Sequence, residues 1–158
     1  MDSLYLVMVI LIGVLAIFDL WVGVSNDAVN FLNGAVGSKA AKFRTVITIA
    51  AIGVFFGCAL SDGMMDIARH GIFNPQYFTY HEVMTIFIAV MITDIVLLNI
   101  FNSFGMPTST TVSLVFEMLG AAFALSIVKM FGPEGLPFAE YLNTGKALEV
   151  ILGIFFSV

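Results

Sequence analysis

The feature that most constrains this fold is the length of its apolar stretches. Leu4–Val24 contains one charged residue, Asp19, and is long enough to cross the ~30 Å hydrocarbon core of a bilayer as a helix. Backbone polar groups inside lipid must be hydrogen-bonded within the chain, so such segments predict transmembrane helices. Further apolar segments lie at about Thr45–Ser61, with its helix expected to begin near Ser38 or Ala40, at Glu82–Phe101 and at Ser109–Met130. The predicted fold class is therefore all-α, a polytopic transmembrane helical protein.

Composition excludes most classes of soluble protein. Hydrophobic residues make up 60% of the 158 residues and charged residues only 11%, whereas a soluble domain carries roughly a quarter charged residues. The sequence has no nucleophile–base pair, glycine-rich phosphate loop or basic stripe, so we predict neither an enzyme nor a nucleic-acid-binding protein. Cys58 is the only cysteine, and His70 and His81 lack paired carboxylates. No cofactor or resident metal is therefore predicted.

Residues 1–158 are predicted to form a single transmembrane domain that is truncated at its C-terminus. A loop is expected over Gly132–Asn143, after which a last apolar helix begins near Thr144 and is still running at Val158. Its apolar part, Leu148–Val158, is too short to span a bilayer, and no polar cap follows it. We interpret the chain as a piece of a longer protein; the alternative is a short terminal helix lying against its neighbours.

The basic residues predict an orientation in the membrane. Lys39, Lys42 and Arg44 cluster between the first two apolar segments, whereas the Asp62–His81 and Gly132–Asn143 loops are neutral to acidic. Basic residues concentrate in cytoplasmic connections of membrane proteins. We therefore expect a multi-pass protein of the cell (inner) membrane with its N-terminus outside and the Lys39–Arg44 segment in the cytoplasm.

A first polar segment, Ser25–Gly34, interrupts the apolar sequence with helical spacing. Asn26, Asn30 and Asn33 recur at i, i+4 and i+7, so that their side chains share one helix face, and Asp27 borders it. Their oxygens suit a hard cation such as Na⁺, and the amide groups can also donate to an anion. The competing interpretation is an amide face that only hydrogen-bonds neighbouring helices.

A second polar segment, Gly105–Thr111, contains Pro107, which ends one helix, followed by Thr108 or Ser109 as the N-cap of the next. The first backbone N–H groups of a helix lack internal partners and carry the positive end of its dipole. With the neighbouring hydroxyls they can hold an anion without Lys or Arg. The competing interpretation is an ordinary capped turn. The hydroxyls in question belong to Ser109, Thr110 and Thr111.

The depth of this second turn favours a ligand over a simple cap. Residues Ile95–Phe116, which flank the turn on both sides, contain no charged residue. A turn exposed to bulk water usually attracts a charge, whereas irregular backbone at membrane depth is tolerated where it lines a cavity. We therefore expect a broken or re-entrant helix at the Pro-Thr-Ser-Thr-Thr turn.

Together the two segments resemble the inorganic phosphate transporter (PiT) family. The residues Asn26–Asn30, followed by Val36–Ala40, are similar to the family motif G-A-N-D-x-A-N with its trailing V-G-S-x-A. The residues Gly105–Thr111 are similar to the start of the family's G-L-P-V-S-T-T-H. The resemblance covers about Asp19–Ala122, and the order and separation of the two motifs fit as well.

The resemblance implies cation-coupled secondary transport of inorganic phosphate by a membrane protein of two inverted repeats, of which this chain is the N-terminal one. The missing second repeat, or a homo-oligomer, would complete the site, and Na⁺ or H⁺ would be the co-transported ion. Carried over onto this sequence, the motifs assign phosphate binding to Ser109, Thr110, Thr111 and Asn26, and cation binding and coupling to Asp27, Asn30 and Asn26. No metal beyond transported Na⁺ is expected.

The sequence departs from the family motifs at a few positions. Val24 and Ser25 replace the Gly-Ala pair, and Val29 replaces an Ala. Val112 stands where the family usually has His. Loss of this His removes a group that titrates near neutral pH, which argues against proton coupling at that position.

Two other function classes stay open at this stage. One is a permease for another tetrahedral oxyanion such as sulfate, and the other is a non-transporting membrane scaffold, if the 158 residues are complete. Three further carboxylates, Asp19, Asp94 and Glu117, fall within apolar segments. Intramembrane carboxylates are functional candidates by default, but the sequence assigns them no partner; Glu117 is interpreted as a buried partner of a polar group or as a coupling residue.

Overall fold

The computed structural model describes residues 3–61, 72–106, 108–132 and 135–157, and these are almost entirely helical. No β-strand occurs within those ranges, where the only β pairing is an isolated bridge between Phe73 and Leu142. The prediction of an all-α protein is confirmed. The elements are α1 (Ser3–Gly37), α2 (Phe43–Ala59), the 3₁₀-helix η2 (Pro75–Tyr77), α4 (Tyr80–Phe104), α5 (Thr110–Met130), α6 (Phe138–Tyr141) and α7 (Thr144–Ser157).

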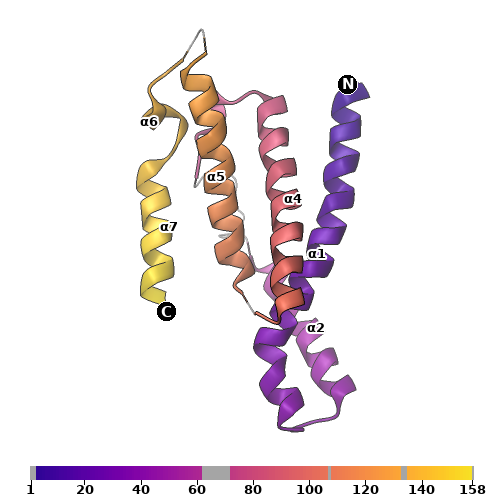
Figure 1. The fold of residues 1–158 in the computed structure, drawn as a ribbon. Helices are drawn as coiled ribbons and strands as arrows, with labels where there is room; N and C mark the ends of the chain where they lie inside the picture. The colour runs from indigo at the N-terminus through magenta and orange to yellow at the C-terminus, as the bar shows by residue number, and fades with distance from the viewer. Residues whose placement is uncertain (1–2, 62–71, 107, 133–134, 158) are drawn as a thin grey trace.

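In the described part of the chain, three helices have the length and apolar character needed to cross a membrane. These are α1 with 35 residues, α4 with 25 and α5 with 21. They lie side by side, with α4 between α1 and α5 (Figure 1). The apolar helix α2 has 17 residues and is shorter than a typical span. The chain therefore has the helix content of a multi-pass membrane protein.

The first helix extends well beyond the predicted apolar span. The span was expected over about Leu4–Val24, and α1 continues without a break to Gly37, so that it contains the whole of the first polar segment, whose spacing is helical. Several of its polar side chains have partners: Ser25 Oγ donates to Trp21 O at 2.8 Å within the helix, and Asn26 and Asn30 donate to groups outside α1. The chain then reverses at Lys39, whose φ is +53°.

The second helix begins later than predicted, at Phe43, because the reversal at Lys39 separates it from α1. The start of α4 also differs by two residues from the predicted Glu82. Thr79 forms a capping box in which its side chain and backbone pair with those of Glu82, so α4 begins at Tyr80. The first half of the predicted Asp62–His81 loop, including His70, lies outside the described residues.

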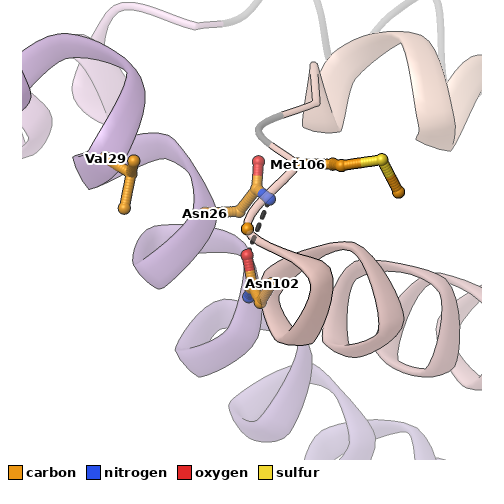
Figure 2. A pocket seen from close by; sticks show the side chains of 5 residues that line it. Asn26, Val29, Asn102 and Met106 are labelled. Carbon is orange, nitrogen blue, oxygen red and sulfur yellow. Dashed lines mark hydrogen bonds between the residues drawn. The ribbon is translucent and has the colours of Figure 1, made fainter.

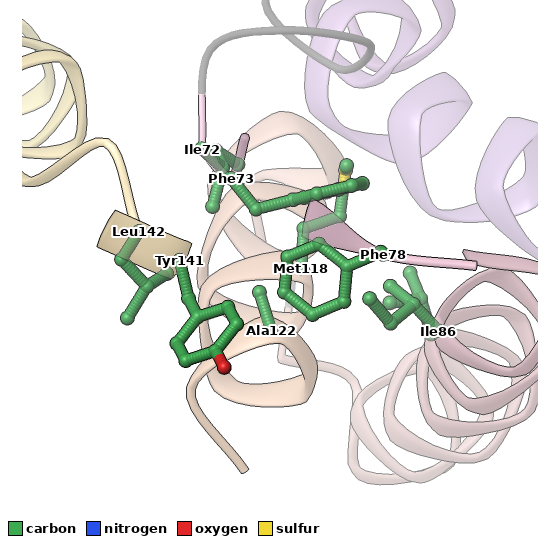
Figure 3. Close-up of a cluster of buried hydrophobic side chains, with 9 residues drawn as sticks. Ile72, Phe73, Phe78, Ile86, Met118, Ala122, Tyr141 and Leu142 are labelled. Atoms are coloured by element: carbon green, nitrogen blue, oxygen red, sulfur yellow. The ribbon is translucent and has the colours of Figure 1, made fainter. Parts of the chain in front are cut away.

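A cluster of buried apolar side chains holds α4 and α5 together towards the end remote from their connecting turn (Figure 3). Beside it Lys129 Nζ pairs with Glu82 Oε2 at 2.8 Å and lies 5.4 Å from the centroid of the Phe78 ring. This end of the pair is therefore fixed by packing and by one ion pair. The cluster consists of Ile72, Phe73, Phe78, Ile86, Val90, Met118, Ala122, Tyr141 and Leu142.

The opposite ends of α4 and α5 meet α1 part-way along its length. In Figure 1 the last turns of α1 extend past the α4–α5 turn and lie beside α2. Gly105 ends α4 in a left-handed conformation with φ +66°, which a residue with a side chain rarely adopts. The fold therefore directs the second polar segment against the middle of α1. Pro107 lies outside the described residues, and the expected broken or re-entrant helix stays a prediction.

Candidate functional site

The two polar segments predicted from the sequence come together in the structure. The side chain of Thr110, at the start of α5, donates to both carboxylate oxygens of Asp27 on α1, at 3.2 and 3.1 Å, across 83 sequence positions. One turn further along α1, Asn30 Nδ2 donates to the carbonyl oxygen of Thr108 at 3.0 Å. The backbone N–H of Thr108 donates in turn to Asn26 Oδ1 at 3.4 Å. Carboxylate, amides, hydroxyl and turn backbone thus form one polar contact.

Asn26 is the most deeply buried member of this contact. Its residue surface is 1% exposed, and its Nδ2 donates to Asn102 Oδ1 on α4 at 2.8 Å (Figure 2). Asn102 Nδ2 donates to Val22 O on α1 at 3.5 Å. A buried amide is costly unless its polar atoms are paired, and here both ends of the Asn26 amide have partners. The pair fixes α1 against the end of α4.

Sequence reasoning missed Asn102 as part of the site. Asn102 lies in the apolar stretch just before the second polar segment. Its polar side chain in that stretch was the one sign in the sequence that it could belong to the site. A lone Asn near a helix end is common, and nothing in the sequence places it beside Asn26. Their contact arises only because α4 ends against α1.

Ser109 is the N-cap of α5, which decides between the two predicted cap residues. Its side chain accepts a hydrogen bond from the backbone N–H of Val112 at 3.4 Å. Helix α5 therefore begins at Thr110, with the positive end of its dipole facing the contact with α1.

Two of the predicted residues lie at the margin of the site. Asn33 and Thr111 are both exposed. Within the described ranges, neither takes part in the hydrogen bonds that join α1 to the turn. The other predicted residues, Asn26, Asp27, Asn30, Ser109 and Thr110, all lie at the contact between α1 and the start of α5.

A small open pocket of about 60 Å³ adjoins this contact. It exceeds the ~10–15 Å³ that one bound water needs, so it has room for a few waters or a small ion. Its lining is mostly apolar and includes two amide side chains (Figure 2). The lining residues are Asn26, Val29, Asn102, Gly105 and Met106.

The geometry sets a condition on anion binding. A threonine hydroxyl has one proton to donate, and the proton of Thr110 is directed at Asp27. An anion that takes a hydrogen bond from Thr110 must therefore displace Asp27 from it.

Comparison with known proteins identifies the family. The family model described as the phosphate transporter family matches residues 23–158. The chain belongs to this family. The match includes both polar segments and every residue of the contact described above, and with the three long apolar helices it makes the chain a multi-pass membrane protein.

Individual relatives agree with this assignment. The chain is 28% identical over 136 residues to a protein of Thermococcus kodakarensis assigned as a phosphate permease, covering 84% of this chain. It is 33% identical over 116 residues, 71% of this chain, to one from Pyrococcus furiosus. A Mycobacterium bovis protein with the same assignment is 26% identical over 148 residues, 92% of this chain.

The chain spans only part of these relatives. The matched regions are 30%, 28% and 26% of the lengths of the Thermococcus, Pyrococcus and Mycobacterium proteins. No solved structure matches the chain with statistical significance.

Proposed function

We propose that the complete protein moves inorganic phosphate across the membrane by cation-coupled secondary transport. The observation that carries the proposal is the hydrogen-bonded contact between Asp27 on α1 and Thr110 at the N-terminus of α5. It joins an ionisable carboxylate to an anion-binding helix end at a place where α1 runs past the α4–α5 turn. Membership of the phosphate transporter family supports phosphate as the anion.

Phosphate is held, in this proposal, by the start of α5 and the buried amide of α1. The unpaired first N–H groups of α5 and the hydroxyls of Ser109, Thr110 and Thr111 donate to the phosphate oxygens, with Asn26 as a further donor. The helix dipole contributes only about half an elementary charge at this end. The remaining negative charge of the anion needs another source of compensation.

A co-transported cation, Na⁺ or H⁺, supplies that compensation. Asp27 and the amide oxygens of Asn30 and Asn26 form a ligand set of the hard, oxygen-rich type that Na⁺ prefers. In the described part of the chain, no Lys or Arg hydrogen-bonds to this contact. Cation binding beside Asp27 would release the hydroxyl of Thr110 for the anion, so that the two solutes bind together.

Residues 1–158 constitute, in the same proposal, the first of two inverted repeats with the N-terminus outside and Lys39–Arg44 in the cytoplasm. Two observations support this architecture. The chain matches less than a third of each relative, and the polar contact is open on one side through the pocket lined by Asn26 and Asn102. A second copy of the same contact would face it across the substrate, which is the general plan of many secondary transporters.

Uptake by the complete protein in proteoliposomes tests this function. We expect accumulation of labelled phosphate that excess unlabelled phosphate competes away and excess sulfate does not, because only phosphate carries a proton near neutral pH with which to donate to a site carboxylate. Uptake should also rise when a sodium or proton gradient is imposed. Equal competition by sulfate would favour a general oxyanion permease, and no uptake of either anion would contradict transport.

A further inference from the structure

Three carboxyl groups from three different helices meet inside the membrane-spanning part of the protein. Asp94 on α4 is 5% exposed and lies within hydrogen-bonding reach of Asp19 on α1 and of Glu117 on α5. The hydroxyl of Ser113 donates to Glu117 Oε1 at 2.9 Å. The cluster therefore lies where α1, α4 and α5 pack together, and none of its three acids belongs to the polar contact of the candidate site.

Each acid in the cluster has an unpartnered oxygen. Asp19 Oδ1, Asp94 Oδ1 and Glu117 Oε2 are buried and accept no hydrogen bond within the described part of the chain. Ionised carboxylates are acceptors only, so two of them can share a hydrogen bond only when one carries a proton. Buried polar atoms without partners are rare in native structures, and a donor from outside the chain is the usual explanation.

The cluster is separated from the candidate site by an apolar layer. Along α4 the residues Asp94, Leu98 and Asn102 are spaced by four, so they share a face, and Leu98 between the two polar side chains is fully buried. A Cβ atom added to Gly23 of α1 would lie 3.9 Å from Leu98 Cδ1 and 3.9 Å from Thr110 Cγ2. At 1.5 Å per residue, Asp94 lies about 12 Å along the helix axis from Asn102.

Nothing in the described ranges supplies positive charge to the cluster. Apart from the three acids of the cluster, α1 carries Asp27 at the polar contact, and α2 carries Arg44 in its first turn. The remaining acidic and basic side chains of α4 and α5, His81, Glu82 and Lys129, lie at the opposite end of the α4–α5 pair. Lys129 is engaged by Glu82, and His81 is exposed. No three His, Cys, Asp or Glu side chains in these ranges are arranged to hold a metal ion.

Three ionised carboxylates that lie together in a low-dielectric interior repel one another unless a positive charge or a proton compensates them. We propose that Asp19, Asp94 and Glu117 form a proton-binding site, in which at least one carboxyl O–H donates to a neighbouring carboxylate at neutral pH. Protonation adds H⁺ to one carboxylate oxygen, and release returns it to water. If the proposed transport function holds, this cluster would also couple transport to protons. It would then supply the titratable group that is missing at Val112, where the family motif has His.

Infrared difference spectroscopy of the complete transporter in lipid nanodiscs tests the site without requiring transport. We expect the carbonyl band of a protonated, buried carboxylic acid at neutral pH, lost as the pH is raised. Asp94→Asn should remove at least half of its amplitude, whereas Glu149→Gln, which changes an exposed carboxylate on α7, should leave it unchanged. Absence of the band from the wild-type protein would overturn the proposal whatever the variants do.

Two further measurements distinguish a proton-binding site at this cluster from a cation site and from the candidate phosphate site. Replacing choline by sodium at constant pH should leave the band in place; loss of the band on adding sodium would identify a cation site and overturn the proton assignment. In Asp94→Asn, the stimulation of phosphate uptake by a pH gradient should fall at least tenfold, whereas phosphate binding should persist. A band that titrates in a protein that does not transport would refute the proposed function and leave the proton site standing.

Discussion

Asp27→Asn in the complete transporter should abolish cation-stimulated phosphate uptake while the protein remains folded in the membrane. The substitution preserves the size of the side chain and one acceptor for the hydroxyl of Thr110 but removes the charge that would bind the cation. A cation held by neutral oxygens alone loses its strongest electrostatic partner. Phosphate uptake in sodium and in choline media at fixed pH measures the effect.

A matched control for this variant is Asn33→Ala. Asn33 lies on the same helix and belongs to the same predicted amide face, but it is exposed and outside the hydrogen bonds to the turn. We expect it to keep wild-type sodium stimulation. If Asp27→Asn keeps that stimulation as well, Asp27 is not a coupling ligand, and a pH gradient then shows whether protons drive uptake.

Loss of a hydroxyl at the start of α5 should weaken phosphate binding about ten- to a hundredfold, since a hydrogen bond to a charged ligand contributes roughly 1.5–3 kcal/mol. Thr110→Val removes the hydroxyl and keeps the shape of the side chain. Ser109→Ala would also remove the helix cap, at a cost of about 1 kcal/mol in stability, whereas Ser109→Gly largely retains the helix start. Equilibrium binding of labelled phosphate to the purified transporter gives the affinities.

Thermal unfolding of the same samples separates ligand binding from folding. Thr93→Val is the control, because the hydroxyl of Thr93 donates to Ala89 O within α4 and its residue is exposed. We expect Thr93→Val to bind phosphate as the wild type does. Unchanged affinity in Thr110→Val and Ser109→Gly, with only a lower midpoint of unfolding, would support the interpretation of this segment as a simple capped turn.

Much of this arrangement follows from local sequence. Apolar length predicted the three long spans α1, α4 and α5, although it also suggested a span at α2, which has only 17 residues. The spacing of Asn26 and Asn30 placed them on one helix face, where both reach the turn. The pattern of Pro, Ser and Thr predicted the start of α5, because an N-cap depends on neighbouring residues only.

The features that the sequence did not predict depend on contacts between helices. The spacing of the Asn residues predicted a helix through the first polar segment, but not the partners that its amides find on α4 and on the turn. The pairing of Asn26 with Asn102 and the meeting of Asp94 with Asp19 and Glu117 likewise need the packed arrangement. Sequence showed which polar residues were present in the apolar segments but not which of them face one another.

The most direct test of the account is to locate the bound anion. Arsenate has the shape and protonation of phosphate, and arsenic scatters anomalously, so a crystal structure of the complete transporter with arsenate places the ligand without assumptions about transport. We predict an anomalous peak at the N-terminus of α5, within hydrogen-bonding distance of Thr110 and beside Asn26. A peak elsewhere, for instance next to Lys129 at the opposite end of α5, with none at this contact, would contradict the account.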